Sequence, residues 1–428
     1  MARKSRLLQE IGENIMKYQT ETLNIENIDV EILNSINREF MKLEDNRHGS
    51  YDIHFMNEIV MIVFLGLMAN CDEWTTIHMF AETHFEWLKT FLHLKWGLPS
   101  KATIMRVMAM INSKDLEEIC VNFMMEKIYE LETKLHLENT RDIIPIDGKS
   151  CNGSGRESSK DGKIKKVQAM SAYSTKYDMC LATEFIEEKT NEIPTAPKLL
   201  SRLNLENTII TFDALNTQED TIKYITKNHA DYVAAVKGNQ GILYEDLIEY
   251  FENKDIIKEI EDKNYMIKRE KSHSQIETRK YYFTTDVNWI SNKKKWSKLL
   301  SIGMVEKTIE KDNKKTVERR YYISSLSEND FEEFVAAVRK EWEIENNLHW
   351  HLDVTFKEDK NLCSQKEAQK NLNILRKFCL NILKIAQPSY KLSIKNIRFK
   401  LSMNFEIEFP KLISLLNTES IINLVRPS

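Results

Sequence analysis

The chain changes character at residues 143–150, which read IIPIDGKS. The first five residues are a short apolar run typical of a β-strand, and they end in the carboxylate of Asp147. Residues 208–213, which read TIITFD, repeat the arrangement and end in Asp213. A carboxylate at the end of a strand lies at the rim of a sheet, where sites form in α/β folds. Gly148 would let the backbone turn away directly after Asp147.

Each aspartate also has a purely structural interpretation. Asp147 followed by Gly148 is a common turn pair, and Asp213 is well suited to cap the N-terminus of a following helix. Two strands that both end in aspartate are more informative than either one, because neighbouring strands would bring the two carboxylates together. Like charges in close contact are unfavourable unless a cation neutralises them. The pair therefore favours a cation site.

The sequence around these two strands predicts an α/β (mixed α+β) domain with a mixed sheet. Further strands are expected at residues 166–174, 180–187, 232–236 and 320–324, and helices at residues 197–203, 218–227, about 330–348 and about 367–386. Upstream, residues 53–137 carry apolar side chains at helical spacing and predict a helical bundle, in which Ser100 can cap a helix. The predicted parts are an N-terminal helical domain at 1–138, a first core part at 139–239, an inserted strand-rich segment at 240–318, a second core part at 319–390 and a C-terminal helical tail at 391–428.

The composition is that of an ordinary soluble globular protein, with 428 residues of which 42% are apolar and 29% are charged. The most apolar run, residues 59–69, is shorter than the roughly 20 residues that a membrane helix needs. The N-terminus has no signal-peptide apolar core, and the 6 scattered cysteines contain no CxxC pair, which indicates reduced thiols. We therefore expect a cytoplasmic protein without a membrane segment.

A third acid, Glu345, follows the apolar face of the helix expected from about residue 330. That face carries Phe331, Phe334, Val335, Val338 and Trp342, and the next position on it is Glu345. A carboxylate buried against the sheet is costly unless it has a partner. A metal ion is one such partner, and a salt bridge with Lys149 or Lys237 is the structural alternative. If the helix persists, Asp353 continues the same face and is a rival for the third ligand.

Three hard oxygen ligands suit Mg²⁺, with Mn²⁺ as a possible substitute, and do not suit zinc. Two such ions about 4 Å apart can activate an attacking water or 3′-hydroxyl and stabilise the leaving oxygen in phosphoryl transfer. The sequence contains no GxxxxGK[ST] loop and no GxSxG elbow, so neither nucleotide hydrolysis nor serine-hydrolase chemistry is supported.

Basic side chains stand near these acids, although the net charge of the chain is −4. Each of them can be a solvated or ion-paired side chain. Contact with the backbone of a polyanion such as DNA is the functional interpretation. The candidates for such contacts are Lys149, Lys237, Arg279, Arg319, Arg320 and His349.

Several ordered motifs together carry a family resemblance. They read IPIDGKS, EKTNEIP, TFDALNTQ, DYVAAVKGNQ, IETRKYY, RYYISSL, EWEIENNLHWHLDVTFKED and NLNILRK. In order and spacing, over about residues 40–390, they resemble the ISAs-one family of insertion-sequence transposases, which includes the H-repeat-associated proteins. The segment GLPSKATIMRVM at 97–108 is similar to that family's associated helical domain.

The resemblance implies a ribonuclease-H-like catalytic core, magnesium dependence, and cleavage and transfer of DNA at the ends of an insertion sequence. The family's three catalytic acids fall on Asp147, Asp213 and Glu345. The expected partners are double-stranded DNA, as element terminal inverted repeats and target, and a second copy of the chain on that DNA. The N-terminal domain would aid DNA-end binding or dimerisation, and the insertion would contact DNA or close over the site.

The sequence departs from the family pattern in its basic and polar residues. An arginine usually follows the DGK motif, where this chain has Ser150, Cys151 and Asn152, and a histidine commonly stands at Glu341. The basic segment after the FxED motif is replaced by residues 361–364. These losses favour an alternative, a catalytically impaired DNA-binding relative that regulates transposition, whereas the three retained acids argue against it. A structure-selective nuclease that does not transpose is a third hypothesis.

Overall fold

The computed structural model describes residues 25–45, 47, 53–135, 141–158, 162–164, 166–187, 191–272, 275–311, 314–361, 363 and 365–416. Residues 1–24 and 417–428, which belong to the predicted N-terminal domain and C-terminal tail, lie outside this description. So do residues 188–190 of the EKTNEIP motif. Among the described residues, no helix combines the length and the apolar character needed to cross a bilayer.

The centre of the molecule is a five-stranded part of a larger sheet, in the order β5-β4-β1-β6-β7. β4 is antiparallel to both of its neighbours, whereas β1, β6 and β7 run parallel. This is the ribonuclease-H-like arrangement that the resemblance implied. The strands are β1 (Asp142–Cys151), β4 (Val167–Ser174), β5 (Met179–Phe185), β6 (Thr208–Phe212) and β7 (Asp231–Val236).

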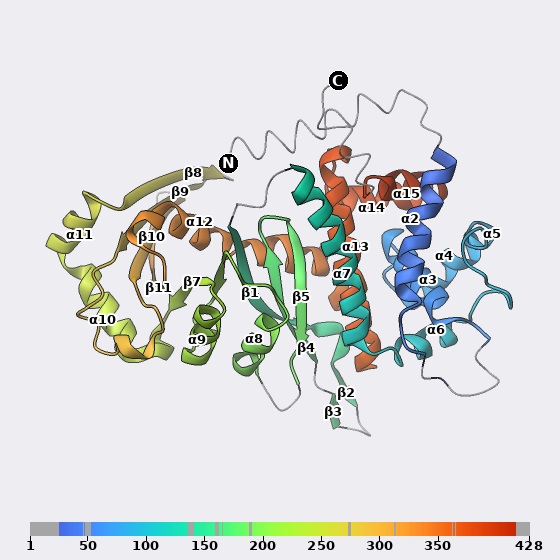
Figure 1. Cartoon of the computed structure of the whole chain (residues 1–428), viewed down its shortest axis with the longest axis horizontal. Coiled ribbons are helices and arrows are strands. Elements are labelled where there is room, and N and C mark those ends of the chain that lie inside the picture. Colours follow the sequence, from blue (N-terminus) through green and yellow to red (C-terminus); the bar gives the residue numbers. More distant parts are fainter. Residues whose placement is uncertain are drawn as a thin grey trace.

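Four antiparallel strands extend this sheet beyond β7, so that one sheet of nine strands results. They are β11 (Lys314–Ser324), β10 (Ser301–Lys311), β9 (Gln275–Thr284) and β8 (Tyr265–Ser272), in that order from β7. Helices α10 (Gly241–Glu252) and α11 (Lys254–Glu261) accompany them at the end opposite the helical bundle (Figure 1). The predicted strand-rich insertion therefore continues the core sheet. A small hairpin, β2 (Arg156–Ser158) and β3 (Gly162–Ile164), stands apart from it.

The alternation of side chains along the central strands explains how helices cover both faces. Ile144 and Ile210 join the core that contains helices α8 (Glu192–Leu200) and α9 (Glu219–Lys227). Ile143 and Ile209, one residue earlier on each strand, face the opposite way and pack with helix α12 (Phe331–Lys340). Odd-numbered residues of β1 and β6 thus share the α12 face, which is the face on which Asp147 and Asp213 continue.

The helical bundle is built from both ends of the chain. Its long helices α7 and α13 pack together, and α14 and α15 contact α3 and α2, so residues 394–414 of the predicted C-terminal tail are part of the bundle (Figure 1). Ser100 caps α6 by accepting a hydrogen bond from the Thr103 amide, as predicted. The helices are α2 (Ile25–Phe40), α3 (Met56–Met68), α4 (Trp74–Thr83), α5 (Phe85–Leu88), α6 (Lys101–Met108), α7 (Ser113–Leu135), α13 (Lys366–Tyr390), α14 (Ile394–Met403) and α15 (Phe405–Ser414).

Candidate active site

Asp147 lies within strand β1, and the expectation that it ends the strand was wrong. β1 continues to Cys151, because β4 pairs with it from Ile146 onward. On its other side, however, β6 stops at Phe212, and the last parallel pair joins Pro145 to Thr211. Extended by two residues, past the end of β6, this register would set Asp213 opposite Asp147. That the two carboxylates share a site stays a prediction.

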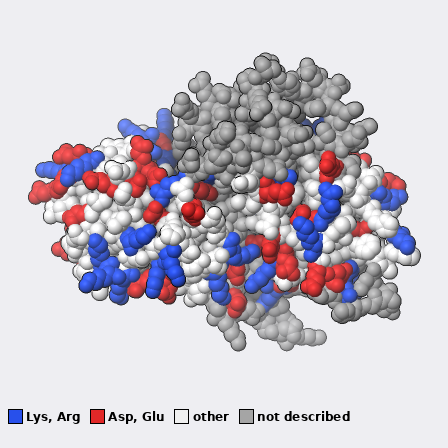
Figure 2. Space-filling model, viewed as in Figure 1, with Lys and Arg blue, Asp and Glu red and all other residues white. Residues whose placement is uncertain are grey.

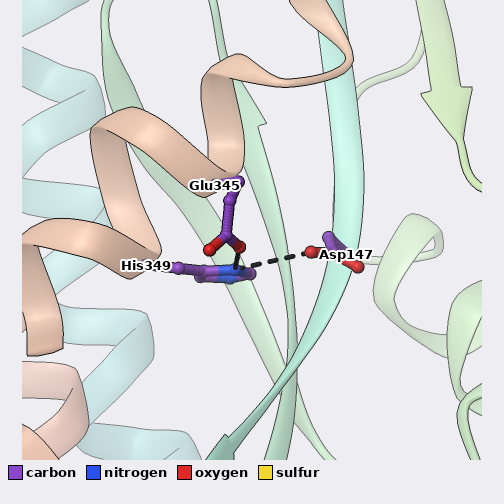
Figure 3. A group of neighbouring side chains, drawn as sticks. All are labelled: Asp147, Glu345 and His349. Atoms are coloured by element: carbon purple, nitrogen blue, oxygen red, sulfur yellow. Dashed lines mark hydrogen bonds and ion pairs between the residues drawn. The ribbon is translucent and has the colours of Figure 1, made fainter. Parts of the chain in front are cut away.

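Glu345 reaches the same place by a route that the periodicity did not predict. Helix α12 ends at Lys340, and π-helical turns follow at Glu345–His349 and His351–Thr355. The chain has thus left the regular helix α12 before it reaches Glu345, the first residue of the π-helical part. The Glu345 side chain is 56% exposed, so the prediction that it lies on the buried face was wrong. Its carboxylate points toward the His349 ring, which also faces Asp147 on β1 (Figure 3).

His349 lies between these two acids. Its Nδ1 atom is 3.1 Å from Glu345 Oε2 and 3.4 Å from Asp147 Oδ2, and one ligand atom from each of the three residues lies within 4.8 Å of the others (Figure 3). Burial lowers the pKa of His349, but the hydrogen bonds and charges of the two carboxylates outweigh burial and raise it. The hydrogen bond from His349 lowers the pKa of Glu345. His349, which we expected to contact DNA, thus faces the acids.

Asp213 is held by the turn that follows β6. Its Oδ1 atom accepts hydrogen bonds from the Asn216 amide at 3.2 Å and from Asn216 Nδ2 at 3.0 Å. The cap of the next helix is Gln218, so the structural interpretation of Asp213 as that helix's N-cap is wrong. Asp213 is not a member of the group formed by Asp147, Glu345 and His349; it directly follows β6, the strand that pairs with β1.

Two further acids that the sequence analysis missed lie near these residues. Burial, and then the charges of Asp147 and Asp213, raise the pKa of Glu192 at the start of α8. Burial likewise raises the pKa of Glu341 to about 7, with Arg320 opposing and Asp213 adding to the rise. Glu192 had a signal, since it belongs to the EKTNEIP motif. The crowding of carboxylates is what a site for cations would show.

The raised pKa of Glu341 predicts a pH dependence of stability. Because the folded state favours the protonated acid, stability should fall as the pH rises from about 4.5 to about 7 and then level off. A Glu341→Gln variant keeps a neutral partner for Tyr322 and Arg320. It should be more stable than wild type by about 2 kcal/mol at pH 8, and the gap should close near pH 4.5. Urea unfolding of both proteins in EDTA at pH 8 and at pH 4.5 measures this difference in the free energy of unfolding. The same difference at the two pH values would contradict the prediction.

The rival third ligand, Asp353, has a different partner. Lys149 Nζ donates to Asp353 Oδ1 at 2.6 Å and lies 3.7 Å from Glu358 and 3.9 Å from Asp359. Only 10% of the Lys149 side chain is exposed. Lys149 therefore pairs with Asp353, Glu358 and Asp359. The ion pair that Glu345 makes is with His349, and neither Lys149 nor Lys237 takes that place.

The other predicted cations lie on or near the strand extension. Lys237 is exposed directly after β7, whereas Arg279 pairs with Glu277 at 2.5 Å and Arg319 with Glu306 at 2.9 Å. Arg320 pairs with Glu318 at 2.8 Å, and its guanidinium lies 4.8 Å from the centre of the Trp342 ring. Figure 2 shows basic and acidic side chains interleaved over the described part of this face.

Known protein families match the chain on both sides of its domain boundary. A family model described as "Transposase DDE domain" matches residues 138–382, and one described as "DDE_Tnp_1-associated" matches residues 38–124. The chain belongs to the DDE transposase family. The first match contains the whole site, and the second lies within the helical bundle of this transposase.

Similar proteins from Escherichia coli carry related names. The chain is 33% identical over 339 residues to "H repeat-associated putative transposase YhhI" of strain K12, a match that covers 77% of this transposase and 85% of YhhI. It is 32% identical over 355 residues to "Putative transposase YncI" of Escherichia coli O157:H7, and this match covers 82% of this transposase and 87% of YncI. A solved piggyBac transposase synaptic complex with hairpin DNA shows only a weak likeness, with a TM-score of 0.34, 11% identity and coverage of 91% and 79%.

Proposed function

We propose that this chain cleaves and joins DNA strands at the ends of an insertion sequence by metal-dependent phosphoryl transfer. Asp147, Asp213 and Glu345 are the proposed catalytic acids and cation ligands. The observation that supports the proposal is the group of Asp147, Glu345 and His349, whose ligand atoms lie within 4.8 Å of one another. Asp213 is included because the parallel register of β1 and β6, extended by two residues, would set it opposite Asp147.

The residues present fit a divalent cation with a preference for oxygen. Asp147 and Glu345 offer carboxylate oxygens, and Asp213 offers another beside them, which suits Mg²⁺ or Mn²⁺. Bound there, two such ions would activate the attacking hydroxyl and stabilise the leaving oxygen. His349 holds two of the carboxylates in place through Nδ1. Its position is that of a positioning residue or an additional ligand.

Double-stranded DNA is the proposed substrate, and the proposed localisation is therefore the nucleoid. The exposed Lys237 follows β7, the neighbour of β6, and Arg320 lies on β11, which pairs with β7. We propose that both contact phosphates that approach the site. Arg279 and Arg319, farther along the extension, are proposed to contact flanking DNA after exchanging their acidic partners for phosphates. Because an element has two ends and each end needs one site, a homodimer is the simplest arrangement.

Separate substitutions of Glu345 and Asp353, the two candidates for the third ligand, test the assignment. Glu345→Gln should reduce Mg²⁺-dependent nicking of a duplex carrying the element's terminal repeat by at least about a hundredfold, because it removes a cation ligand. The matched control, Asp353→Asn, loses an acid from the same π-helical segment and should reduce the rate by less than about tenfold. Single-turnover nicking of a labelled duplex measures both variants.

The reverse order of effects would make Asp353 the third ligand. If both substitutions reduced the nicking rate only slightly and equally, neither residue would be a ligand of the site. Both variants should bind the duplex as wild type does in a gel-shift assay in EDTA, so that a loss of nicking reports on chemistry.

A further inference from the structure

Glu192 lies against β1 at the residue after Asp147, although it comes from a helix on the opposite side of the sheet from α12. It is the first residue of α8, whose N-cap Asn191 accepts a hydrogen bond from the Ile193 amide. That helix covers the face of the sheet away from α12. At the open end of β6, no strand separates the two faces next to β1. A side chain from α8 can therefore reach round to the acids.

The contact with β1 is close and requires glycine. A Cβ atom on Gly148 would lie 2.3 Å from Glu192 Oε1 and 2.5 Å from its carboxyl carbon. The strand residue directly after Asp147 thus lacks a side chain where the Glu192 carboxylate rests. Because β1 is extended at Gly148, this contact explains the glycine, and the turn expected from the sequence does not.

The charge environment places Glu192 near both aspartates. After burial, Asp147 and Asp213 are the largest causes that raise its pKa. The Asn216 side chain opposes this rise in the pKa of Glu192, and Asn216 donates Nδ2 to Asp213 Oδ1 at 3.0 Å. The Asn216 side chain is fully buried, and its Oδ1 atom has no hydrogen-bond partner among the described residues. An orphaned oxygen next to three mutually repelling carboxylates is an unsatisfied arrangement that a bound cation would satisfy.

We propose that Glu192 is a fourth carboxylate of the cation site and serves as the ligand that joins the Asp147 side to the Asp213 side. The inference rests on the proposed function and extends its three acids by one. It assigns to Gly148 the role of making room for this carboxylate and to Asn216 the role of positioning Glu192 and Asp213. An acid at the start of a helix also interacts with the helix dipole, which is the alternative explanation of Glu192.

Mn²⁺ binding to the full chain without DNA separates these explanations. Free Mn²⁺, followed by electron paramagnetic resonance during a titration, reports the affinity of the site without any need for activity. Glu192→Gln should weaken Mn²⁺ binding at least about tenfold, since even outer-shell changes at metal sites cost about 10- to 100-fold. Glu219→Gln is the matched control, because Glu219 is an exposed first-turn acid of the next helix. It should change the affinity by less than about twofold.

A second variant tests the same contact while keeping the charge. Gly148→Ala should displace the Glu192 carboxylate and weaken Mn²⁺ binding in the wild-type background. It should add no further loss to Glu192→Ala, in which the space is already open. The thermal midpoint of Glu192→Gln in EDTA should equal or exceed that of wild type, because the substitution relieves repulsion. A helix-dipole role would lower that midpoint and leave Mn²⁺ binding unchanged.

The outcomes distinguish this inference from the proposed function. Wild-type Mn²⁺ affinity in Glu192→Gln, together with a loss in Asp213→Asn, would overturn the role of Glu192 and leave the three-acid site standing. Wild-type affinity in Glu192→Gln, Asp213→Asn and Asp147→Asn alike would overturn both.

Discussion

An Asp147→Asn variant is expected to lose Mg²⁺-dependent DNA nicking by on the order of a thousandfold or more, which corresponds to about 4 kcal/mol of transition-state stabilisation. Asp147 is the residue that the other groups of the site share. The register of β1 and β6, extended by two residues, would set it opposite Asp213, and it contacts His349, which also contacts Glu345. Asparagine keeps the shape of the side chain but removes its charge and half of its acceptor oxygens. The fold should remain, since 35% of the Asp147 side chain is exposed.

Single-turnover nicking of the terminal-repeat duplex measures this loss. Asp220→Asn is the matched control, because Asp220 is an exposed acid on α9, and it should nick at nearly the wild-type rate. Nicking by Asp147→Asn within about tenfold of wild type would refute the assignment. Duplex binding by wild type without any nicking in Mg²⁺ or Mn²⁺ would instead support the alternative of a regulatory relative.

Arg398→Met is expected to destabilise the folded protein by about 3–5 kcal/mol, the usual range for breaking a buried ion pair. Arg398 on α14 is fully buried and donates to Asp72 Oδ1 at 2.6 Å and to the Leu67 carbonyl at 2.5 Å. It also donates to the carbonyl of Thr355, and its guanidinium lies 4.0 Å from the centre of the Phe356 ring. One side chain thus connects the C-terminal helices, the N-terminal bundle and the end of the π-helical segment that carries Glu345.

The substitution would leave the Asp72 carboxylate, only 4% exposed, with Lys357 at 3.6 Å as its remaining ion pair. Urea unfolding followed by circular dichroism measures the change. The double variant Asp72→Asn/Arg398→Met should recover part of the loss, because it no longer buries an uncompensated charge. A loss below about 1 kcal/mol in Arg398→Met, or no recovery in the double variant, would show that Arg398 does not hold these segments together.

The sequence contained enough information to predict that the strands around the two aspartates are neighbours. Apolar strands that end in Asp147 and Asp213, with strand and helix alternation around them, predict neighbouring parallel strands, and the structure has them as neighbours. The length of β1 was not predictable in this way. It depends on pairing with β4, and the hydrophobic pattern does not fix how far that pairing extends.

The position of Glu345 shows the limit of periodicity. The 3.6-residue spacing is reliable through Val338, which is buried, but Trp342 is 48% exposed. Regular α-helix ends at Lys340 and residues 341–342 form a turn, so the 3.6-residue phase is not kept up to Glu345. The resemblance identified Glu345 because a motif does not depend on helical phase. His349 and Glu192 were missed as parts of the site for a related reason, since only tertiary structure brings their elements to Asp147.

Locating Mn²⁺ directly in a crystal of the full chain tests the central claim, which is that Asp147, Asp213 and Glu345 share a divalent-cation site. Anomalous difference maps recorded at the manganese absorption edge would show each bound ion. The account predicts a peak bounded by the carboxylates of these three residues, and its loss in Asp147→Asn crystals. At saturating Mn²⁺, a peak only at Asp353 and Asp359, or no peak near Asp147, would contradict it.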